Sequence, residues 1–135
     1  NRRASLRTIV AGQRVPIELT SLGRAYLATL DDAARGELLA RIMRSYRSAS
    51  WRPVGQEIDK AIAKVSAAGY CVASWQPGVV AIATPLNGTG GQAMVLNLSL
   101  ATDEPGASIE RRHAATLMAL KEGILHDLQV REIDA

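Results

Sequence analysis

The clearest feature of this sequence is a β-hairpin. Residues 92–101 alternate strictly, so that Val95, Asn97 and Ser99 fall on one side and four apolar residues on the other: Met94, Leu96, Leu98 and Leu100. Residues 78–86 (GVVAIATPL) are rich in β-branched side chains, as a buried strand should be. The segment between the two runs, Asn87-Gly88-Thr89-Gly90-Gly91, has the composition of a tight turn. The sequence therefore predicts two antiparallel strands with one strongly apolar face.

Helical patterns surround this hairpin. Thr20 is a candidate N-cap for a helix over residues 20–30, and Asp31 and Asp32 open a second helix over residues 31–47. A third helix is predicted after Pro53 and ends at Gly69, and a long amphipathic helix covers residues 109–130. Further strands are predicted over residues 5–10 and 69–75. This order predicts an α+β fold, an antiparallel β-sheet flanked by helices.

Composition excludes several classes of protein. The 135 residues are 47% hydrophobic and 21% charged, which fits one globular domain. The longest uncharged stretch is broken by Gly, Pro, Ser and Asn, so no membrane helix is expected. A single cysteine, Cys71, excludes an intrachain disulfide and leaves too few thiolates for a structural zinc site. No signal peptide is recognisable, which predicts a cytoplasmic protein.

Positive charge is concentrated at the start of the chain. Residues 1–52 hold ten arginines and four acids, whereas residues 53–135 carry a net charge of −3. Such a basic segment can contact nucleic acid phosphates. Four of these arginines are also interleaved with apolar residues at helical spacing, as on the solvated face of a helix: Arg35, Arg41, Arg44 and Arg47. We favour the interpretation that these four arginines form the solvated face of a helix over contact with nucleic acid.

No catalytic constellation is recognisable. Cys71 lies within a predicted strand, where a cysteine is usually an inert core residue. His113 and His126 are thirteen residues apart on one helix, too far to share a metal ion. The glycines at 88–91 lack the Lys-Ser/Thr that completes a phosphate loop. We therefore expect no enzyme activity, no metal and no cofactor.

Two sets of residues are candidates for binding a small ligand. Ser21, Leu22 and Gly23 begin a helix, where backbone N–H groups are free to bind an anion. Alternatively, Thr20 only caps this helix and Gly23 only permits close packing. Asn97 and Ser99 lie on one face of a strand, facing either solvent or a polar cavity.

Three segments in order resemble the effector-binding domain of the IclR family of bacterial transcriptional regulators. They are GQRVPIELTSLGRAYLATL, AAGYCVASWQPGVVAIATPL and AMVLNLSLA, followed by the last helix. The resemblance implies a GAF-like domain, covering residues 1–135 but lacking its N-terminal part, that binds a small metabolite. It also implies a winged helix-turn-helix domain that binds operator DNA and has no counterpart in this chain. Because the chain starts at Asn1 rather than Met, we expect a fragment.

The resemblance further implies site residues and partners. The family's ligand pocket matches Ser21, Leu22, Gly23, Asn97 and Ser99, together with three strand positions: Ala73, Val79 and Ala81. The position of Ala73 often holds an acid in the family, so ligands that need that carboxylate are disfavoured, and Trp75 is either an aromatic wall of the pocket or a packing residue.

The implied ligand is a small organic acid, aliphatic or aromatic. The implied assembly is a homodimer or homotetramer, with residues 38–46 and the last helix as candidate contact surfaces. An enzyme or scaffold on the same GAF-like fold is the alternative.

Overall fold

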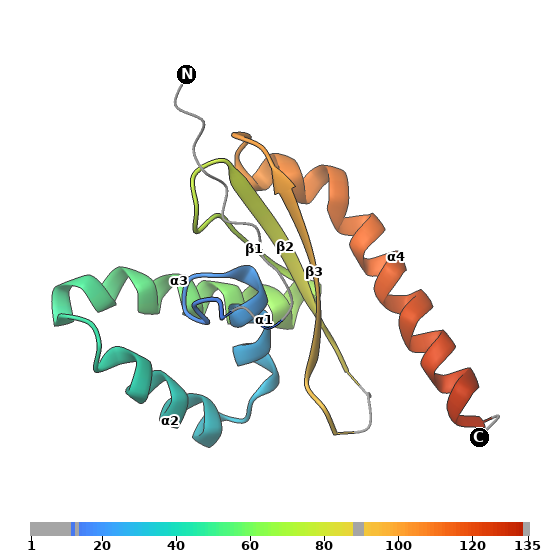
Figure 1. The fold of residues 1–135 in the computed structure, drawn as a ribbon, viewed down its shortest axis with the longest axis horizontal. Coiled ribbons are helices and arrows are strands. Elements are labelled where there is room, and N and C mark those ends of the chain that lie inside the picture. The colour runs from blue at the N-terminus through green and yellow to red at the C-terminus, as the bar shows by residue number, and fades with distance from the viewer. Residues whose placement is uncertain (1–11, 13, 88–90, 134–135) are drawn as a thin grey trace.

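The chain folds as a three-stranded antiparallel sheet between helices. The computed structural model describes residue 12 and residues 14–87 and 91–133. Strands β1 (Cys71–Ala73), β2 (Val79–Leu86) and β3 (Met94–Ala101) are ordered β1-β2-β3. Helices α1 (Ser21–Thr29) and α3 (Ser48–Ala68) lie on one face, and α4 (Gly106–Ile133) lies on the other (Figure 1). The predicted α+β class is confirmed.

Strand register divides the sheet into two faces. Cys71 pairs with Ala83, which pairs with Asn97, and these three side chains share the α1 and α3 face because alternate residues of a strand point the same way. Cys71 and Ala83 pack there with Ala25 and Ala61, and with partly buried Val65 and Val95. Ile82, which is fully buried, points to the opposite face toward α4. The alternation predicted for β3 is confirmed.

At Gly23, α1 packs unusually close against the turn that precedes it. A Cβ atom on Gly23 would stand 2.2 Å from the carbonyl oxygen of Ile17 and 2.3 Å from its Cα. The Thr20 hydroxyl accepts a hydrogen bond from the Gly23 amide (3.0 Å) and donates one to the Pro16 carbonyl (2.9 Å). Thr20 is therefore the N-cap, as the sequence predicted, and Gly23 is required by close approach of backbone.

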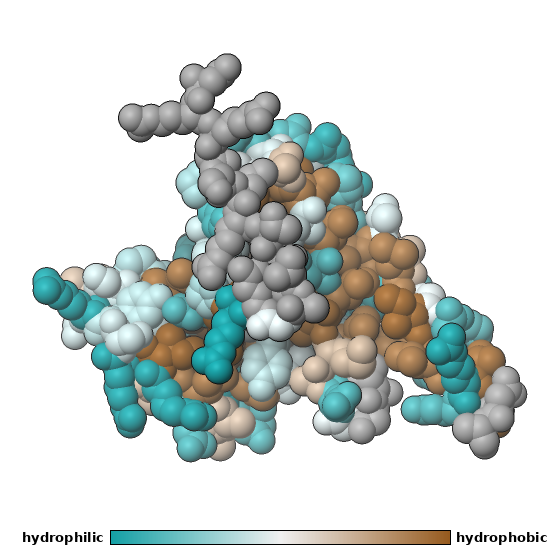
Figure 2. All heavy atoms as spheres, in the orientation of Figure 1, coloured by the Kyte–Doolittle hydropathy of each residue, from teal (hydrophilic) through white to brown (hydrophobic). Residues whose placement is uncertain are grey.

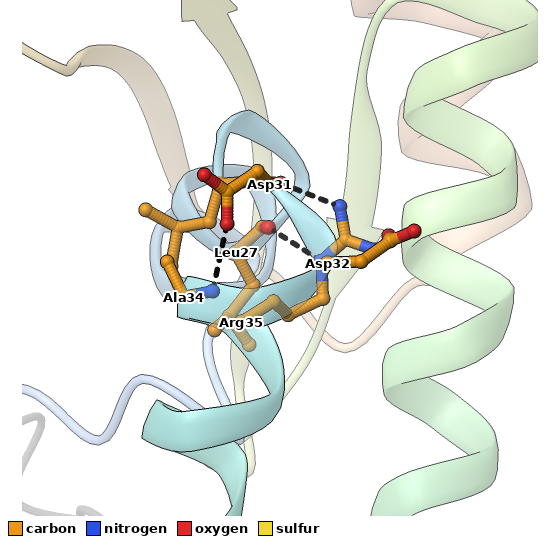
Figure 3. Close-up of polar contacts among 6 residues, drawn as sticks. Leu27, Asp31, Asp32, Ala34 and Arg35 are labelled. Atoms are coloured by element: carbon orange, nitrogen blue, oxygen red, sulfur yellow. Dashed lines mark hydrogen bonds and ion pairs between the residues drawn. The ribbon is translucent and has the colours of Figure 1, made fainter.

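Arg35 ties the end of α1 to the start of α2 (Asp32–Met43). Its Nε donates to the carbonyl of Leu27 and its Nη2 to the carbonyl of Leu30, both at 2.9 Å (Figure 3). These carbonyls lie at the end of α1, where the ladder of helical hydrogen bonds ends, and the Leu27 carbonyl also accepts from the Leu30 amide at 3.3 Å. Asp31 caps α2 by accepting from the Ala34 amide at 2.7 Å. Arg35 thus has a structural role, whereas Arg41, Arg44 and Arg47 are exposed.

Several predicted boundaries were wrong. The second helix ends at Met43 rather than 47, and none of its residues is buried. The third helix begins at Ser48 and contains Pro53, which was expected to precede it. Pro53 removes only the hydrogen bond to the carbonyl of Ala49, and that exposed residue can be hydrated. Gly69 ends α3 with φ of 90°, as predicted.

The remaining differences are smaller. The strand expected over residues 69–75 contains only Cys71–Ala73, and the last helix extends beyond residues 109–130 at both ends. Pairing of Leu86 with Met94 confirms the hairpin. The strand predicted over residues 5–10 and the turn residues 88–90 lie outside the described residues. No helix in the described part of the chain is both long and apolar enough to cross a bilayer.

Apolar side chains gather on the surface over β3 and α4 (Figure 2). Met94 is 43% exposed and Leu120 is 51% exposed, and both are large enough to contribute to an apolar patch. Leu96, Leu98 and Leu100 of β3 are half-buried.

Candidate functional site

The predicted site residues of the strands all lie on the sheet face that α1 covers. Ala73 pairs with Ala81, which pairs with Ser99, and this row is adjacent to the row that contains Asn97. Val79 belongs to the same face because it is two residues from Ala81. Apart from Asn97 and Ser99, the side chains of these two rows are small and apolar, so polar groups on this face are few.

A short chain of hydrogen bonds joins α1 to β3 across this face. The Ser21 hydroxyl donates to Asn97 Oδ1 at 3.2 Å, and Asn97 Nδ2 donates to the Ser99 hydroxyl at 3.0 Å. Ser21 is buried, Asn97 is half-buried and Ser99 is exposed. The structure therefore brings together three predicted residues from segments that are 76 positions apart, and the polar chain runs from the interior to the surface. We call these three residues the Ser21–Asn97–Ser99 site.

The other predicted residues are placed around this site. Leu22 and Gly23 line a separate cavity of about 270 Å³ with Tyr26 and Val95. The amide of Gly23 already donates to Thr20. The packing role of Gly23 is thus visible in the structure, whereas a ligand role for it stays a prediction. Ala73 lines a different and larger cavity at the edge of the sheet.

That larger cavity has a volume of about 620 Å³ and lies along β1, which is an edge strand within the described sheet. We call it the Arg24 groove and define it by six of its lining residues: Arg24, Glu57, Ala73, Trp75, Ala107 and Glu110. Arg24 is only 9% exposed, and its Nε donates to the carbonyl of Glu18 at 3.0 Å. Burial lowers the pKa of Arg24, an effect partly offset by Glu57, Cys71 and Glu18.

A polar cluster forms one wall beside the groove. Glu110 accepts a hydrogen bond from the Tyr70 hydroxyl at 2.7 Å and forms an ion pair with Lys64 at 2.6 Å. The Lys64 ammonium also lies 5.4 Å from the centroid of the Tyr70 ring. The hydrogen bonds from Lys64 and Tyr70 lower the pKa of Glu110, so this carboxylate is ionised and already satisfied.

Cys71 has the properties of a buried packing residue. It is 1% exposed, and burial raises its pKa to about 11, so the thiol is protonated at neutral pH. Its Sγ donates to the carbonyl of Ser21 at 3.4 Å. Such a thiol is a poor nucleophile. Among the described residues, no group of three or more His, Cys, Asp or Glu side chains is arranged to hold a metal ion.

Sequence reasoning missed the Arg24 groove. From the sequence alone, Arg24 is equally compatible with adding positive potential beside Gly23 and with facing solvent, and nothing marks it as part of a groove. The residues that enclose the groove come from α1, α3, the segment at β1 and the start of α4, so no local motif marks them. The one available signal was an arginine on the predicted helix between two small residues, Gly23 and Ala25.

Comparison with known proteins finds a related regulatory protein. The chain is 31% identical over 121 residues to the Pca regulon regulatory protein of Pseudomonas putida, covering 87% of this chain and 42% of that protein. The chain thus spans less than half the length of this relative. No protein-family model matches the chain.

Solved structures with the same fold are transcriptional regulators. An IclR family transcriptional regulator from Brucella abortus matches with a TM-score of 0.71 and 20% identity, over 86% of this chain and 43% of that one. The inducer-binding domain of the PobR transcription factor from Acinetobacter, a double mutant in complex with 3-hydroxybenzoic acid, matches with a TM-score of 0.62 and 20% identity, over 93% of this chain and 73% of that one. The resemblance predicted from the sequence is confirmed, and the chain has the effector-domain fold of the IclR family of transcriptional regulators.

Proposed function

We propose that the chain is the ligand-sensing domain of an IclR-type transcriptional regulator, and that a small organic acid bound at the Ser21–Asn97–Ser99 site modulates binding of operator DNA. The observation that carries this proposal is the hydrogen bond from the Ser21 hydroxyl to Asn97 Oδ1. It places a hydroxyl, an amide and the first turn of α1 together on an otherwise apolar sheet face. A carboxylate needs such donors within an apolar surrounding.

The nature of the ligand is supported by charge and by a neighbour. The N-terminus of α1 has positive dipole character, and its first turn contains no acidic side chain to oppose an anion. The PobR inducer-binding domain, which has a similar fold, is solved with 3-hydroxybenzoic acid. We therefore propose an aliphatic or aromatic monocarboxylate of similar size as the ligand class, with Ala73, Val79 and Ala81 forming the apolar floor.

Signal transmission follows from the connection between α1 and α2. Arg35 holds the end of α1 by bonding to the carbonyls of Leu27 and Leu30 (Figure 3). A displacement of α1 at Ser21 is therefore passed to α2, provided that the ligand binds one arrangement better than another. Coupling of this kind is typically about 1–3 kcal/mol, which changes operator affinity about 5- to 150-fold.

The direct test uses the full-length regulator that carries this domain. Ser21→Ala and Asn97→Ala should leave operator binding without ligand unchanged, yet raise the concentration of the active carboxylate needed for half-maximal response by about ten- to a hundredfold. The reason is that a lost hydrogen bond to a charged ligand group costs about 1.5–3 kcal/mol. The measurement is operator binding titrated with a panel of monocarboxylates that includes 3-hydroxybenzoate.

Ser66→Ala supplies the matched control, because Ser66 is exposed on α3 and distant in sequence from both site segments. This variant should respond at the wild-type concentration. If Ser21→Ala and Asn97→Ala also respond at that concentration, the ligand binds elsewhere.

We also propose that the regulator is a homodimer or homotetramer and contacts DNA through a separate N-terminal domain. The candidate contact surfaces are α2, which buries none of its residues, and α4, on which Leu120 is 51% exposed. Sedimentation of the isolated chain should show self-association, and Leu120→Glu should weaken it if α4 is the contact, because a charge would then be desolvated at the interface. A monomer at every concentration would contradict the proposal.

A further inference from the structure

Arg24 is buried, and most of its guanidinium group has no partner among the described residues. The residue is 9% exposed, and its only hydrogen bond with a described residue is from Nε to the carbonyl of Glu18. No hydrogen bond or ion pair with a described residue engages Nη1 or Nη2. These nitrogens are not sealed in the interior, because every fully buried polar side-chain atom among the described residues has a partner. They therefore open toward the space that Arg24 lines, which is the Arg24 groove and a smaller cavity of about 290 Å³ that shares Glu57, Val72 and Glu110 with it.

The other charges around the groove are paired with one another. Glu110 forms its ion pair with Lys64 at 2.6 Å, and Glu57 forms one with Lys60 at 3.3 Å. Arg24 interacts with Glu57 only through space, since no ion pair joins them. Among the charged residues that line the groove, Arg24 alone has no ion-pair partner in the described part of the chain, and the Glu18 carboxylate attracts it only through space. A ligand with one negative charge would balance the Arg24 guanidinium, whereas a polyanion would meet the carboxylates of Glu57 and Glu110.

The shape and walls of the groove favour a compact ligand. Its volume of about 620 Å³ suits a small molecule, and its apolar walls include Leu19, Val72 and the half-buried indole of Trp75. Gly106 and Ala107, the first two residues of the 28-residue helix α4, line the same groove. The positive end of that helix dipole adds to the attraction of the guanidinium for an anion.

We propose that the Arg24 groove is a second ligand site, separate from the Ser21–Asn97–Ser99 site, and that it binds a monocarboxylate with an aromatic or compact apolar body. The planar fork of Nη1 and Nη2 matches a carboxylate in two parallel hydrogen bonds. The body of the ligand lies against Trp75. Ala73 lies in the groove wall and also in the strand row of Ser99, so the two sites are neighbours on one sheet.

The test is a titration of the full chain with benzoate, followed by the NMR signals of the two tryptophan indole N–H groups. The Trp75 signal should shift and saturate. The Trp51 signal should stay unchanged, because Trp51 lies on α3 in edge-to-face contact with Tyr46 and does not line the groove. Benzamide, which has the same shape without charge, should produce no saturable shift. Trp51→Phe removes one of the two indole signals and thereby assigns both.

Two substitutions assign the effect to the groove. Arg24→Gln should weaken benzoate binding about ten- to a hundredfold. Ala107→Asp should weaken it by a similar factor, because it places a negative charge at the exposed rim without removing the bond between Arg24 and Glu18. Ala119→Asp, an exposed residue later on α4, is the matched control and should leave binding unchanged.

The proposal is overturned if the Trp75 signal does not saturate with benzoate, or if benzamide shifts it equally. It is also overturned if Ala107→Asp and Arg24→Gln, both folded, bind benzoate as the unmodified chain does. Should Arg24→Gln fail to fold, Ala107→Asp decides alone. A Trp75 response that is lost in Asn97→Ala but kept in Ala107→Asp would assign benzoate to the Ser21–Asn97–Ser99 site only, which overturns the second site and leaves the proposed function standing.

Discussion

Gly23→Ala is expected to lower the free energy of unfolding by about 3 kcal/mol, the upper part of the usual range for overpacking. The added Cβ would stand 2.2 to 2.6 Å from backbone atoms of Ile17, which are not free to rotate away as a side chain would. Either α1 or the segment before it must therefore move. Since Ser21 of the candidate site is in the same helical turn, ligand binding should weaken as well.

The matched control for this prediction is Gly36→Ala. Gly36 is also within a helix, but a Cβ there would have no atom within 4 Å. Alanine should stabilise this helix by about 0.5–1 kcal/mol through its higher helix propensity. Urea unfolding followed by circular dichroism measures both variants. Equal stability of the Gly23 and Gly36 variants would mean that Ile17 does not pack against α1 as described.

Local signals in the sequence were sufficient for the elements that surround the site. The hydroxyl of Thr20, the left-handed Gly69 and the strict alternation of residues 94–100 each specify a structure over a few residues, and each is found as predicted. The alternation also sets which side chains of β3 face α1. This is why Asn97 and Ser99 were grouped correctly before their partner was known.

Features that depend on contacts between distant segments were not predictable in this way. The ion pair of Lys64 with Glu110 joins α3 to α4, and the groove that Arg24 lines is enclosed by four separate segments. The continuation of α3 through Pro53 was not predictable for the same reason. Proline leaves the carbonyl of Ala49 without its helical hydrogen bond, and this costs little only because Ala49 is exposed in the folded chain. That Ser21 and Asn97 lie near each other was expected only from the family resemblance, since 76 positions separate the two residues, and the hydrogen bond between them was not predicted.

The second large effect is a loss of stability at alkaline pH that depends on Cys71. Burial raises the pKa of this thiol from its ordinary value of 9.0 to about 11. Between these values, the unfolded chain has released a proton that the folded chain retains. The unfolded state therefore binds fewer protons, and the free energy of unfolding falls as pH rises through this window. At about 1.4 kcal/mol for each pH unit, the loss approaches about 2–3 kcal/mol.

Cys71→Ala separates this effect from other groups that titrate at high pH. Burial also raises the pKa values of Tyr46 and Tyr70, so their titration likewise lowers the free energy of unfolding as pH rises. These contributions are present in both the unmodified chain and Cys71→Ala, and they cancel in the comparison. At pH 7 the variant should be less stable than the unmodified chain because it leaves a small cavity. The difference in free energy of unfolding between the two proteins should then shrink from pH 9 to pH 11. Parallel stability curves over this range would show that Cys71 does not titrate on unfolding.

Deprotonation of Cys71 should also weaken ligand binding at the Ser21–Asn97–Ser99 site. The Cys71 thiol donates its hydrogen bond to the carbonyl of Ser21, and Ser21 donates to Asn97. A thiolate cannot donate, and it would repel the carbonyl oxygen that it faces at 3.4 Å. The start of α1 should therefore loosen once the folded chain loses this proton, so affinity for the effector should fall as the pH rises through about 11 in the unmodified chain. In Cys71→Ala the affinity lacks this dependence, and calorimetric titrations of both proteins at pH 7 and pH 11 with the effector found in the operator assay make the comparison.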